Sequence, residues 1–189
     1  MTRILGISGS LRKGSYNAAL LRTAKELAPD GVELEIGSIA GIPLFNQDVQ
    51  ESEGVPPAVI TLKERLAEAD GLLLVTPEYN HGIPGVFKNA IDWSSRPADD
   101  IPKVFGDLPV AVIGAGGLAG TRFAQTGFLL VFRYLHMRPW LGQTLFVDRA
   151  WERFDDSGEL TDADIRERLG RFMTEFAAFC AELPRRRAP

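Results

Sequence analysis

Residues 8–17 read SGSLRKGSYN and concentrate small, hydrogen-bonding side chains directly after an apolar segment. Backbone N–H groups of a glycine-rich turn that opens a helix bind anions well. The side chains that can donate further hydrogen bonds are those of Ser10, Arg12, Ser15 and Asn17. This density of donors predicts a site for the phosphate of a monophosphate ester. A plain turn in which Ser15 caps a helix is the simpler alternative and stays open at this point.

The same stretch nearly matches the loop that binds nucleoside triphosphates. That loop has the form G-x-x-x-x-G-K-[ST], in which the lysine follows the second glycine and reaches the β and γ phosphates. Gly9 and Gly14 have the required spacing. Ser15, however, takes the place of the lysine, and Lys13 lies before the glycine. The sequence therefore disfavours ATP or GTP hydrolysis.

Two further loops follow apolar runs. Residues 76–84, TPEYNHGIP, come after GLLLV, and residues 114–121, GAGGLAGT, come after PVAVI. The second of these loops contains G-x-G-x-x-A, which after a strand suggests a dinucleotide fingerprint. That fingerprint also needs an acidic residue about 20 positions later, whereas residues 108–147 contain no Asp or Glu. We therefore expect no Rossmann-type dinucleotide site there.

Taken together, these loops resemble those of the NAD(P)H-dependent FMN reductases of flavodoxin-like fold, a family that includes chromate, quinone and azo-dye reductases. The resemblance rests on GSLRKGSYN at residues 9–17, PEYN at 77–80, IPG at 83–85, KNA at 88–90 and DW at 92–93. It extends in order and spacing from the first strand to the last helix. Two long motifs at the right separation make it specific.

The resemblance implies a bound FMN and a role for each loop. The first loop would hold the FMN phosphate through Ser10, Arg12, Ser15, Tyr16 and Asn17. The isoalloxazine ring would lie beside residues of the other two loops, namely Pro77, Glu78, Tyr79, Asn80, Ile83, Gly114, Ala115, Gly116 and Gly117. We expect no catalytic side chain, because the flavin carries the hydride chemistry and the protein places it.

The implied activity is that of an FMN-containing oxidoreductase. NADPH or NADH would reduce the flavin and leave before a small-molecule electron acceptor binds, which is a ping-pong mechanism. The acceptor could be a flavin, a quinone, an azo or nitro compound, or a metal ion. Members of the family are typically homodimers or homotetramers. Two alternatives are a flavodoxin-type electron carrier and a non-catalytic flavin-binding sensor or interaction module. The mild net charge of −4 disfavours the carrier.

Two residues of the second loop invite other interpretations. Glu78 could act as a general base, but we favour a structural side chain or a subunit contact. His81 could relay protons or bind a metal, yet His81 and His136 are the only histidines in the chain, and no cluster supports a metal site. We expect His81 to face solvent. We expect the loop to be locked to the body by a helix face that carries Lys88, Asn89 and Asp92.

Short apolar runs alternate with amphipathic segments, as in a parallel sheet with helices on both sides. Strands are expected at residues 4–8, 32–36, 71–76, 109–113 and 144–147. Helices are expected at 16–28, 58–69, 84–93, 121–135 and 161–182, the last capped by Thr161, and a long loop at 41–57. These elements predict an α/β, flavodoxin-like three-layer sandwich with a five-stranded parallel sheet, formed by residues 1–189 as a single domain. Ligands of such folds bind beyond the carboxyl ends of the strands.

Composition narrows the function further. The 189 residues are 45% hydrophobic, as in an ordinary globular protein. Their net charge of −4 argues against a nucleic-acid partner. Cys180 is the only cysteine, so neither an internal disulfide nor a thiolate metal cluster can form. No apolar run reaches the roughly 20 residues of a membrane helix, and no signal peptide is evident. We expect a cytoplasmic protein with no membrane partner and a solvated tail at residues 185–187.

Overall fold

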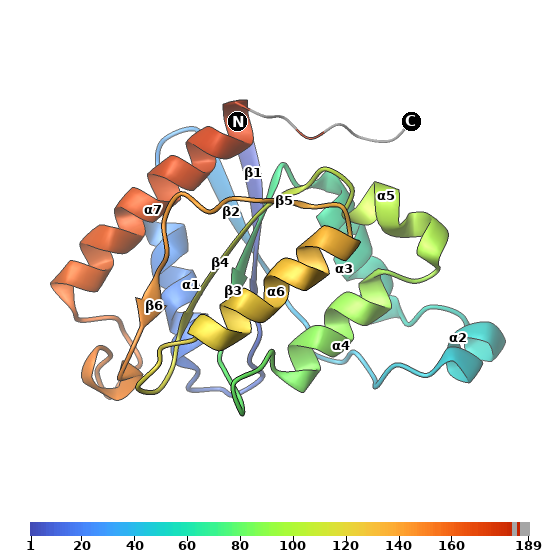
Figure 1. Cartoon of the computed structure of the whole chain (residues 1–189), viewed down its shortest axis with the longest axis horizontal. Coiled ribbons are helices and arrows are strands. Elements are labelled where there is room, and N and C mark those ends of the chain that lie inside the picture. Colours follow the sequence, from blue (N-terminus) through green and yellow to red (C-terminus); the bar gives the residue numbers. More distant parts are fainter. Residues whose placement is uncertain (183–184, 186–189) are drawn as a thin grey trace.

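The computed structural model of the protein describes residues 1–182 and Arg185, and it has a central sheet between two layers of helices (Figure 1). The strands are β1 (Thr2–Ser8), β2 (Val32–Gly37), β3 (Gly71–Val75), β4 (Pro109–Ala115), β5 (Arg138–Pro139) and β6 (Phe146–Val147). The helices are α1 (Tyr16–Glu26), α2 (Gln47–Glu53), α3 (Pro57–Glu68), α4 (Gly85–Ser94), α5 (Ile101–Val104), α6 (Arg122–Tyr134) and α7 (Ala163–Glu182), with the short 3₁₀ helices η1 (Ala98–Asp100) and η2 (Ala150–Glu152). The predicted three-layer α/β sandwich is confirmed.

The sheet is parallel and has the order β2-β1-β3-β4-β5, with β6 also paired to β4. The fifth position is filled by two short strands, because β5 pairs with the start of β4 and β6 pairs with its end. Between them the chain leaves the sheet, and the Trp140 ring packs 4.8 Å from that of Phe172 on α7. A two-residue strand has no apolar alternation, so β5 was missed from the sequence.

Helices on each face of the sheet bury a separate core. On one face, α1 and α7 pack against residues such as Leu73 and Val75 of β3. On the other face, α3, α4, α5 and α6 pack against Leu72 and Leu74 of the same strand. Successive side chains of a strand point to opposite faces, so a strand covered on both sides reads as a continuous apolar run. This is the origin of the GLLLV segment.

All the predicted strands and helices are present, with bounds within two residues of those expected. The predicted loop 41–57 is partly wrong, because it contains α2, which Asn46 caps by accepting a hydrogen bond from the Asp48 N–H at 2.9 Å. No residue of α2 is buried, so it lacks the apolar period by which helices are recognised. The predicted cap of the last helix is also wrong. Asp162, not Thr161, accepts the hydrogen bond of the Ile165 N–H, at 3.0 Å.

The expectation of a solvated tail is wrong at Arg185. This side chain is buried, and its guanidinium donates hydrogen bonds to four backbone carbonyls, those of Leu66, Ala67, Lys103 and Gly106. Arg186 and Arg187 lie outside the described residues. Over the part of the chain that the structure describes, no helix has the length and apolar character needed to cross a membrane.

Candidate functional site

Four loops meet beyond the carboxyl ends of β1, β3, β4 and β6 and line one pocket of about 270 Å³. We refer to residues 8–17, 76–84, 114–121 and 148–152 as the first to fourth loops, and to this cavity as the loop pocket. Its lining residues are Ser10, Arg12, Ser15, Tyr16, Asn17, Pro77, Glu78, Tyr79, Ala115, Gly116, Gly117, Ala150 and Trp151. All the residues predicted for the site are among them except Asn80, Ile83 and Gly114.

Volume alone does not single out the loop pocket. Two cavities of about 330 Å³ lie elsewhere, one lined mainly by α3 and α5 and the other by α4 and α6. Both lie on helix surfaces, whereas the loop pocket lies beyond the strand ends and collects hydroxyl, guanidinium and backbone donors. Parallel α/β folds bind their ligands at the carboxyl edge, so the loop pocket is the candidate site.

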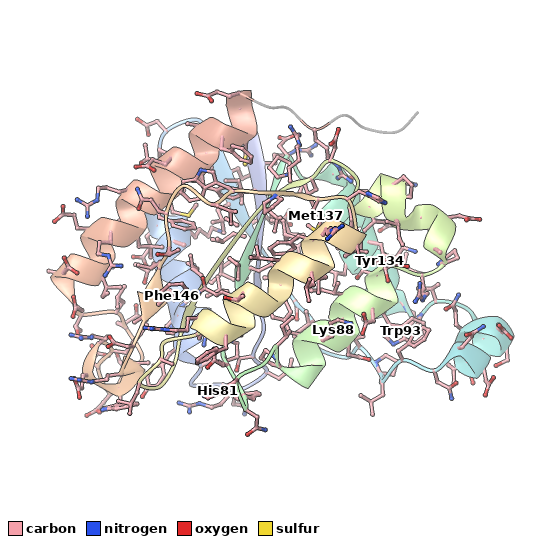
Figure 2. All side chains as sticks on the ribbon, viewed as in Figure 1. His81, Lys88, Trp93, Tyr134, Met137 and Phe146 are labelled. Atoms are coloured by element: carbon pink, nitrogen blue, oxygen red, sulfur yellow. The ribbon has the colours of Figure 1, made fainter. Side chains whose placement is uncertain are left out.

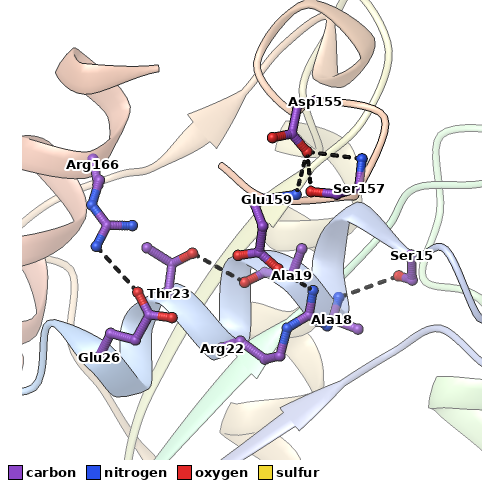
Figure 3. Close-up of polar contacts among 10 residues, drawn as sticks. All are labelled: Ser15, Ala18, Ala19, Arg22, Thr23, Glu26, Asp155, Ser157, Glu159 and Arg166. Carbon is purple, nitrogen blue, oxygen red and sulfur yellow. Dashed lines mark hydrogen bonds and ion pairs between the residues drawn. The ribbon is translucent and has the colours of Figure 1, made fainter. Parts of the chain in front are cut away.

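The first loop leads into α1 through a side-chain cap. The Ser15 hydroxyl accepts a hydrogen bond from the Ala18 N–H at 3.2 Å (Figure 3). A hydroxyl that accepts a hydrogen bond keeps its own proton to donate, so capping and anion binding are compatible. Arg12 folds over the loop and donates to the Gly14 carbonyl from Nε at 3.0 Å and Nη2 at 2.6 Å. The donor set of the loop fits a phosphate ester.

Asn17 connects the first loop to the third. It is buried, its Nδ2 donates to the Ala115 carbonyl at 2.8 Å, and its Oδ1 accepts from the Ala115 N–H at 2.9 Å. Both functions of the amide are therefore engaged within the protein, and one N–H of Nδ2 is left over. These contacts show that Asn17 positions the first and third loops relative to each other. That Asn17 also donates a hydrogen bond to a phosphate stays a prediction.

The second loop is a tight hairpin with a strained tip. Tyr79 and Gly82 exchange backbone hydrogen bonds of 3.3 and 3.0 Å around Asn80 and His81, whose φ angles of 51° and 57° are left-handed. Such angles are uncommon for residues other than glycine. His81 is exposed as predicted, at the tip of the loop, and its ring lies 4.3 Å from that of Phe123 (Figure 2).

Glu78 fastens the second loop to α6. Its Oε2 accepts hydrogen bonds from the N–H groups of Phe123 at 2.9 Å and Ala124 at 3.0 Å. These N–H groups lie in the first turn of the helix, where they lack an intrahelical partner and a negative charge is favoured. The structural role expected for this carboxylate is confirmed.

The helix face on α4 has a different target from the one predicted. Lys88 and Asp92 form an ion pair of 2.6 Å along the helix. Asn89 Nδ2 and Trp93 Nε1 donate to the carbonyl of Pro43 at 2.8 and 2.9 Å, and Trp93 is fully buried (Figure 2). Asn89 and Trp93 therefore hold the segment before α2. The second loop is secured by Glu78 instead.

The glycines of the third loop serve packing as well as access. A Cβ on Gly114 would lie 2.1 Å from the Thr76 carbonyl oxygen, so this glycine lets the second and third loops approach each other. A Cβ on Gly117 would have no atom within 4 Å. Gly117 therefore leaves open space in the loop pocket, whereas Gly114 does not line it.

The fourth loop was missed by the sequence analysis. Its residues Ala150 and Trp151 line the loop pocket, and its backbone is tied to the third loop by hydrogen bonds from the N–H groups of Arg149 and Ala150 to the carbonyls of Gly117 and Gly116. The segment follows the last strand, so the rule that ligands bind beyond strand ends would have identified it. Among the described residues, no group of three or more His, Cys, Asp or Glu side chains could hold a metal ion.

A flavodoxin-like sheet whose first, second and third loops line one pocket at its carboxyl edge is typical of flavodoxin-like flavoenzymes. The sequence model of the family described as NADPH-dependent FMN reductase matches residues 2–152. The chain belongs to this family, and it is therefore an oxidoreductase of the FMN-dependent, NAD(P)H-using type.

Individual relatives agree with this assignment. The chain is 44% identical over 166 residues to an NAD(P)H-dependent FMN reductase of Pseudomonas aeruginosa, covering 87% of this chain and 88% of the relative. It is 37% identical to a 2-hydroxy-1,4-benzoquinone reductase of a Burkholderia species, over 94% of this chain and 95% of the relative. Among solved structures, the flavoenzyme NAD(P)H:acceptor oxidoreductase FerB of Paracoccus denitrificans superposes with a TM-score of 0.85 at 29% identity, covering 97% of this chain and 100% of that one.

Proposed function

We propose that residues 1–189 act as a single FMN-binding domain that oxidises NADPH or NADH and reduces a small-molecule acceptor by a ping-pong mechanism. The observation that carries this proposal is the loop pocket. Residues of the first, second and third loops, proposed for one cofactor, converge there from three strand ends. Bound FMN supplies the hydride and electron transfer, and the protein supplies placement and electrostatics.

The first loop is the proposed phosphate site. The hydroxyls of Ser10 and Ser15, together with N–H groups at the start of α1, would donate hydrogen bonds to the phosphate oxygens. Arg12 would add a charge-assisted hydrogen bond by turning from the Gly14 carbonyl, which it contacts within its own loop. The positive end of the α1 dipole favours the same negative charge.

The second and third loops are the proposed site of the flavin ring. Pro77 is buried at the end of β3 and fixes the start of the second loop, whereas Tyr79 is 55% exposed at the mouth of the loop pocket. Gly117 leaves space for the ring. An open mouth would let the nicotinamide donor and the acceptor use the same flavin face one after the other.

We infer that a quinone is among the acceptors. One of the relatives is named a 2-hydroxy-1,4-benzoquinone reductase. The loop pocket is lined by the exposed aromatic ring of Tyr79, and the exposed Leu118 is next to the lining residue Gly117. Such side chains suit a flat, largely apolar ring better than a hydrated oxyanion.

Anaerobic reduction of the purified, FMN-loaded protein tests the proposed function. NADPH or NADH should abolish the yellow absorbance without a second protein, and a benzoquinone should restore it. Initial rates measured against the NADPH or NADH concentration, at several fixed quinone concentrations, should give parallel double-reciprocal lines. The proposal is wrong if the protein does not bind FMN. Bleaching only with a separate reductase would identify an electron carrier, and FMN binding without turnover would identify a sensor.

We also propose that the protein forms a homodimer or homotetramer through α6. Phe123, Leu130 and Tyr134 lie on one face of this helix by their spacing, and all three are exposed. A second copy would cover these three large side chains, which share one helix face and are not scattered singly over the surface. Light scattering should give a mass of two or four chains, and Leu130→Glu should halve it.

A further inference from the structure

Trp151 is the largest side chain in the wall of the loop pocket, and it belongs to the fourth loop. It lines the pocket together with Arg12 and Tyr16, both of which come from the first loop. More than half of its surface, 55%, is nevertheless exposed. Trp151 thus lines the loop pocket while much of its surface stays open to solvent.

The backbone of the fourth loop is fixed on the amino side of Trp151. The Arg149 N–H donates to Gly117 at 3.1 Å and the Ala150 N–H to Gly116 at 2.9 Å. Arg149 adopts a left-handed φ of 44° to make this turn, and Ala150 is buried. Strain of this kind persists only where the surrounding structure enforces it.

The chain is fixed on the carboxyl side of Trp151 as well. The buried Phe154 packs against the Tyr16 ring with a centroid distance of 5.0 Å. Beyond it, Asp155 Oδ1 accepts hydrogen bonds from Ser157 and from the Glu159 N–H, and the Glu159 carboxylate lies 3.3 Å from the Arg22 guanidinium of α1 (Figure 3). Trp151 is therefore carried by a well-anchored segment.

Core packing does not account for Trp151. The buried neighbours Ala150 and Phe154 supply the apolar contacts of this segment to the body of the protein, whereas Trp151 lines the loop pocket. A large aromatic side chain that is held in place but left half uncovered at a concave site is characteristic of a ligand contact.

We propose that Trp151 contacts the bound flavin at its phosphate end and covers it against solvent. This inference rests on the proposed FMN site in the loop pocket. Phe154, three residues after Trp151, packs against the Tyr16 ring, and the Arg12 guanidinium lies over the same ring at 5.4 Å. Exclusion of water strengthens the attraction between a guanidinium and a phosphate because the local dielectric constant falls. Trp151 would therefore favour flavins that carry the 5′-phosphate.

Equilibrium binding of FMN and of riboflavin to Trp151→Ala, Trp151→Phe and the wild type tests the inference without any turnover. Trp151→Ala should raise the Kd for FMN about 10-fold to 100-fold, the effect of uncovering a large aromatic contact. The Kd for riboflavin should rise several-fold less, because riboflavin lacks the phosphate. Trp151→Phe should recover most of the FMN affinity. Leu141→Ala is the matched control, since Leu141 is 68% exposed and does not line the loop pocket.

Each result is decisive. An unchanged Kd for FMN in Trp151→Ala, with wild-type circular dichroism, would refute the contact. Equal losses for FMN and riboflavin would refute its placement at the phosphate end. Failure of the wild type to bind FMN would instead overturn the proposed function itself, so the two failures are distinguishable.

Discussion

Asn17 shows how one residue can support both the fold and the site. Its buried amide makes two hydrogen bonds to the backbone of Ala115, which lines the loop pocket from the third loop. The partner is 98 positions away in the sequence. Local pattern identified Asn17 as a donor near the site, but only the packing of β1 beside β3 and of β3 beside β4 brings its partner within reach.

We expect Asn17→Ala to lower both stability and FMN affinity. The substitution leaves the N–H and the carbonyl of Ala115 without their partner, which costs about 1–3 kcal/mol for each buried group left unsatisfied. It also frees the third loop from the first. Chemical denaturation and FMN titration measure the two effects.

Arg12→Ala is the control for this prediction. Arg12 is exposed and its side-chain hydrogen bonds stay within its own loop, so its removal should weaken FMN binding and leave the free energy of unfolding nearly unchanged. A stability of Asn17→Ala equal to that of the wild type would contradict the role assigned to the amide.

At the scale of elements, the strands and long helices followed from apolar periodicity, and the short elements did not. The strand β5 and the helix α2 are too short or too exposed to leave a pattern. Helix ends were predicted less well than helix interiors, since a cap depends on side-chain geometry. Thr161 and Asp162 are both acceptable caps by residue type, and the structure selects Asp162 because Thr161 donates to the Arg153 carbonyl at 3.2 Å instead.

The cap of α7 predicts a dependence of stability on pH. The hydrogen bond from the Ile165 N–H, and then the Arg153 guanidinium, lower the pKa of Asp162 below its ordinary value of 3.8. A carboxylate with a lowered pKa stabilises the folded state above its unfolded pKa, and this contribution is lost as the pH falls through the folded pKa. Asp162→Ala should therefore reduce the free energy of unfolding by about 1–2 kcal/mol at pH 7, and by progressively less below pH 3.8.

Urea denaturation from pH 7 to pH 3 measures this difference, with Asp162→Asn as the matched variant. Asparagine caps helices about as well as aspartate, and nothing titrates at that position in Asp162→Asn or Asp162→Ala. The difference in stability between these two variants should thus be independent of pH. A constant difference between the wild type and Asp162→Ala over the same range would contradict the prediction.

At the scale of the molecule, the candidate site and the stabilising contacts of Arg185 lie at opposite edges of the sheet. The loop pocket lies beyond the carboxyl ends of the strands, whereas Arg185 donates to carbonyls at the end of α3 and in the turn before β4, at the amino edge. The alternation of strands and helices predicted a ligand site at the carboxyl edge, because ligand sites of this fold occur there. The contacts of Arg185 at the amino edge were not predictable, since a basic run near a chain end normally is solvated.

Arg185 links the two helical layers, and its removal should destabilise the whole molecule. The helix α7 packs on one face of the sheet, and the Arg185 guanidinium bonds carbonyls of α3 and α5 on the other. Arg185→Ala leaves these carbonyls without a charged donor, at a cost of about 2–4 kcal/mol. At roughly 2–4 °C per kcal/mol for a chain of this size, the Tm should fall by about 4–16 °C.

Arg185→Lys should lose part of this stability, because an ammonium has three donors and no planar fork to reach four carbonyls. The Kd for FMN should remain that of the wild type in both variants, since the contacts lie at the edge away from the loop pocket. Thermal denaturation followed by circular dichroism, together with FMN titration, separates the two effects. A wild-type Tm for Arg185→Ala would mean that the guanidinium does not join the layers, and a weakened FMN affinity would mean that the two edges of the sheet are coupled.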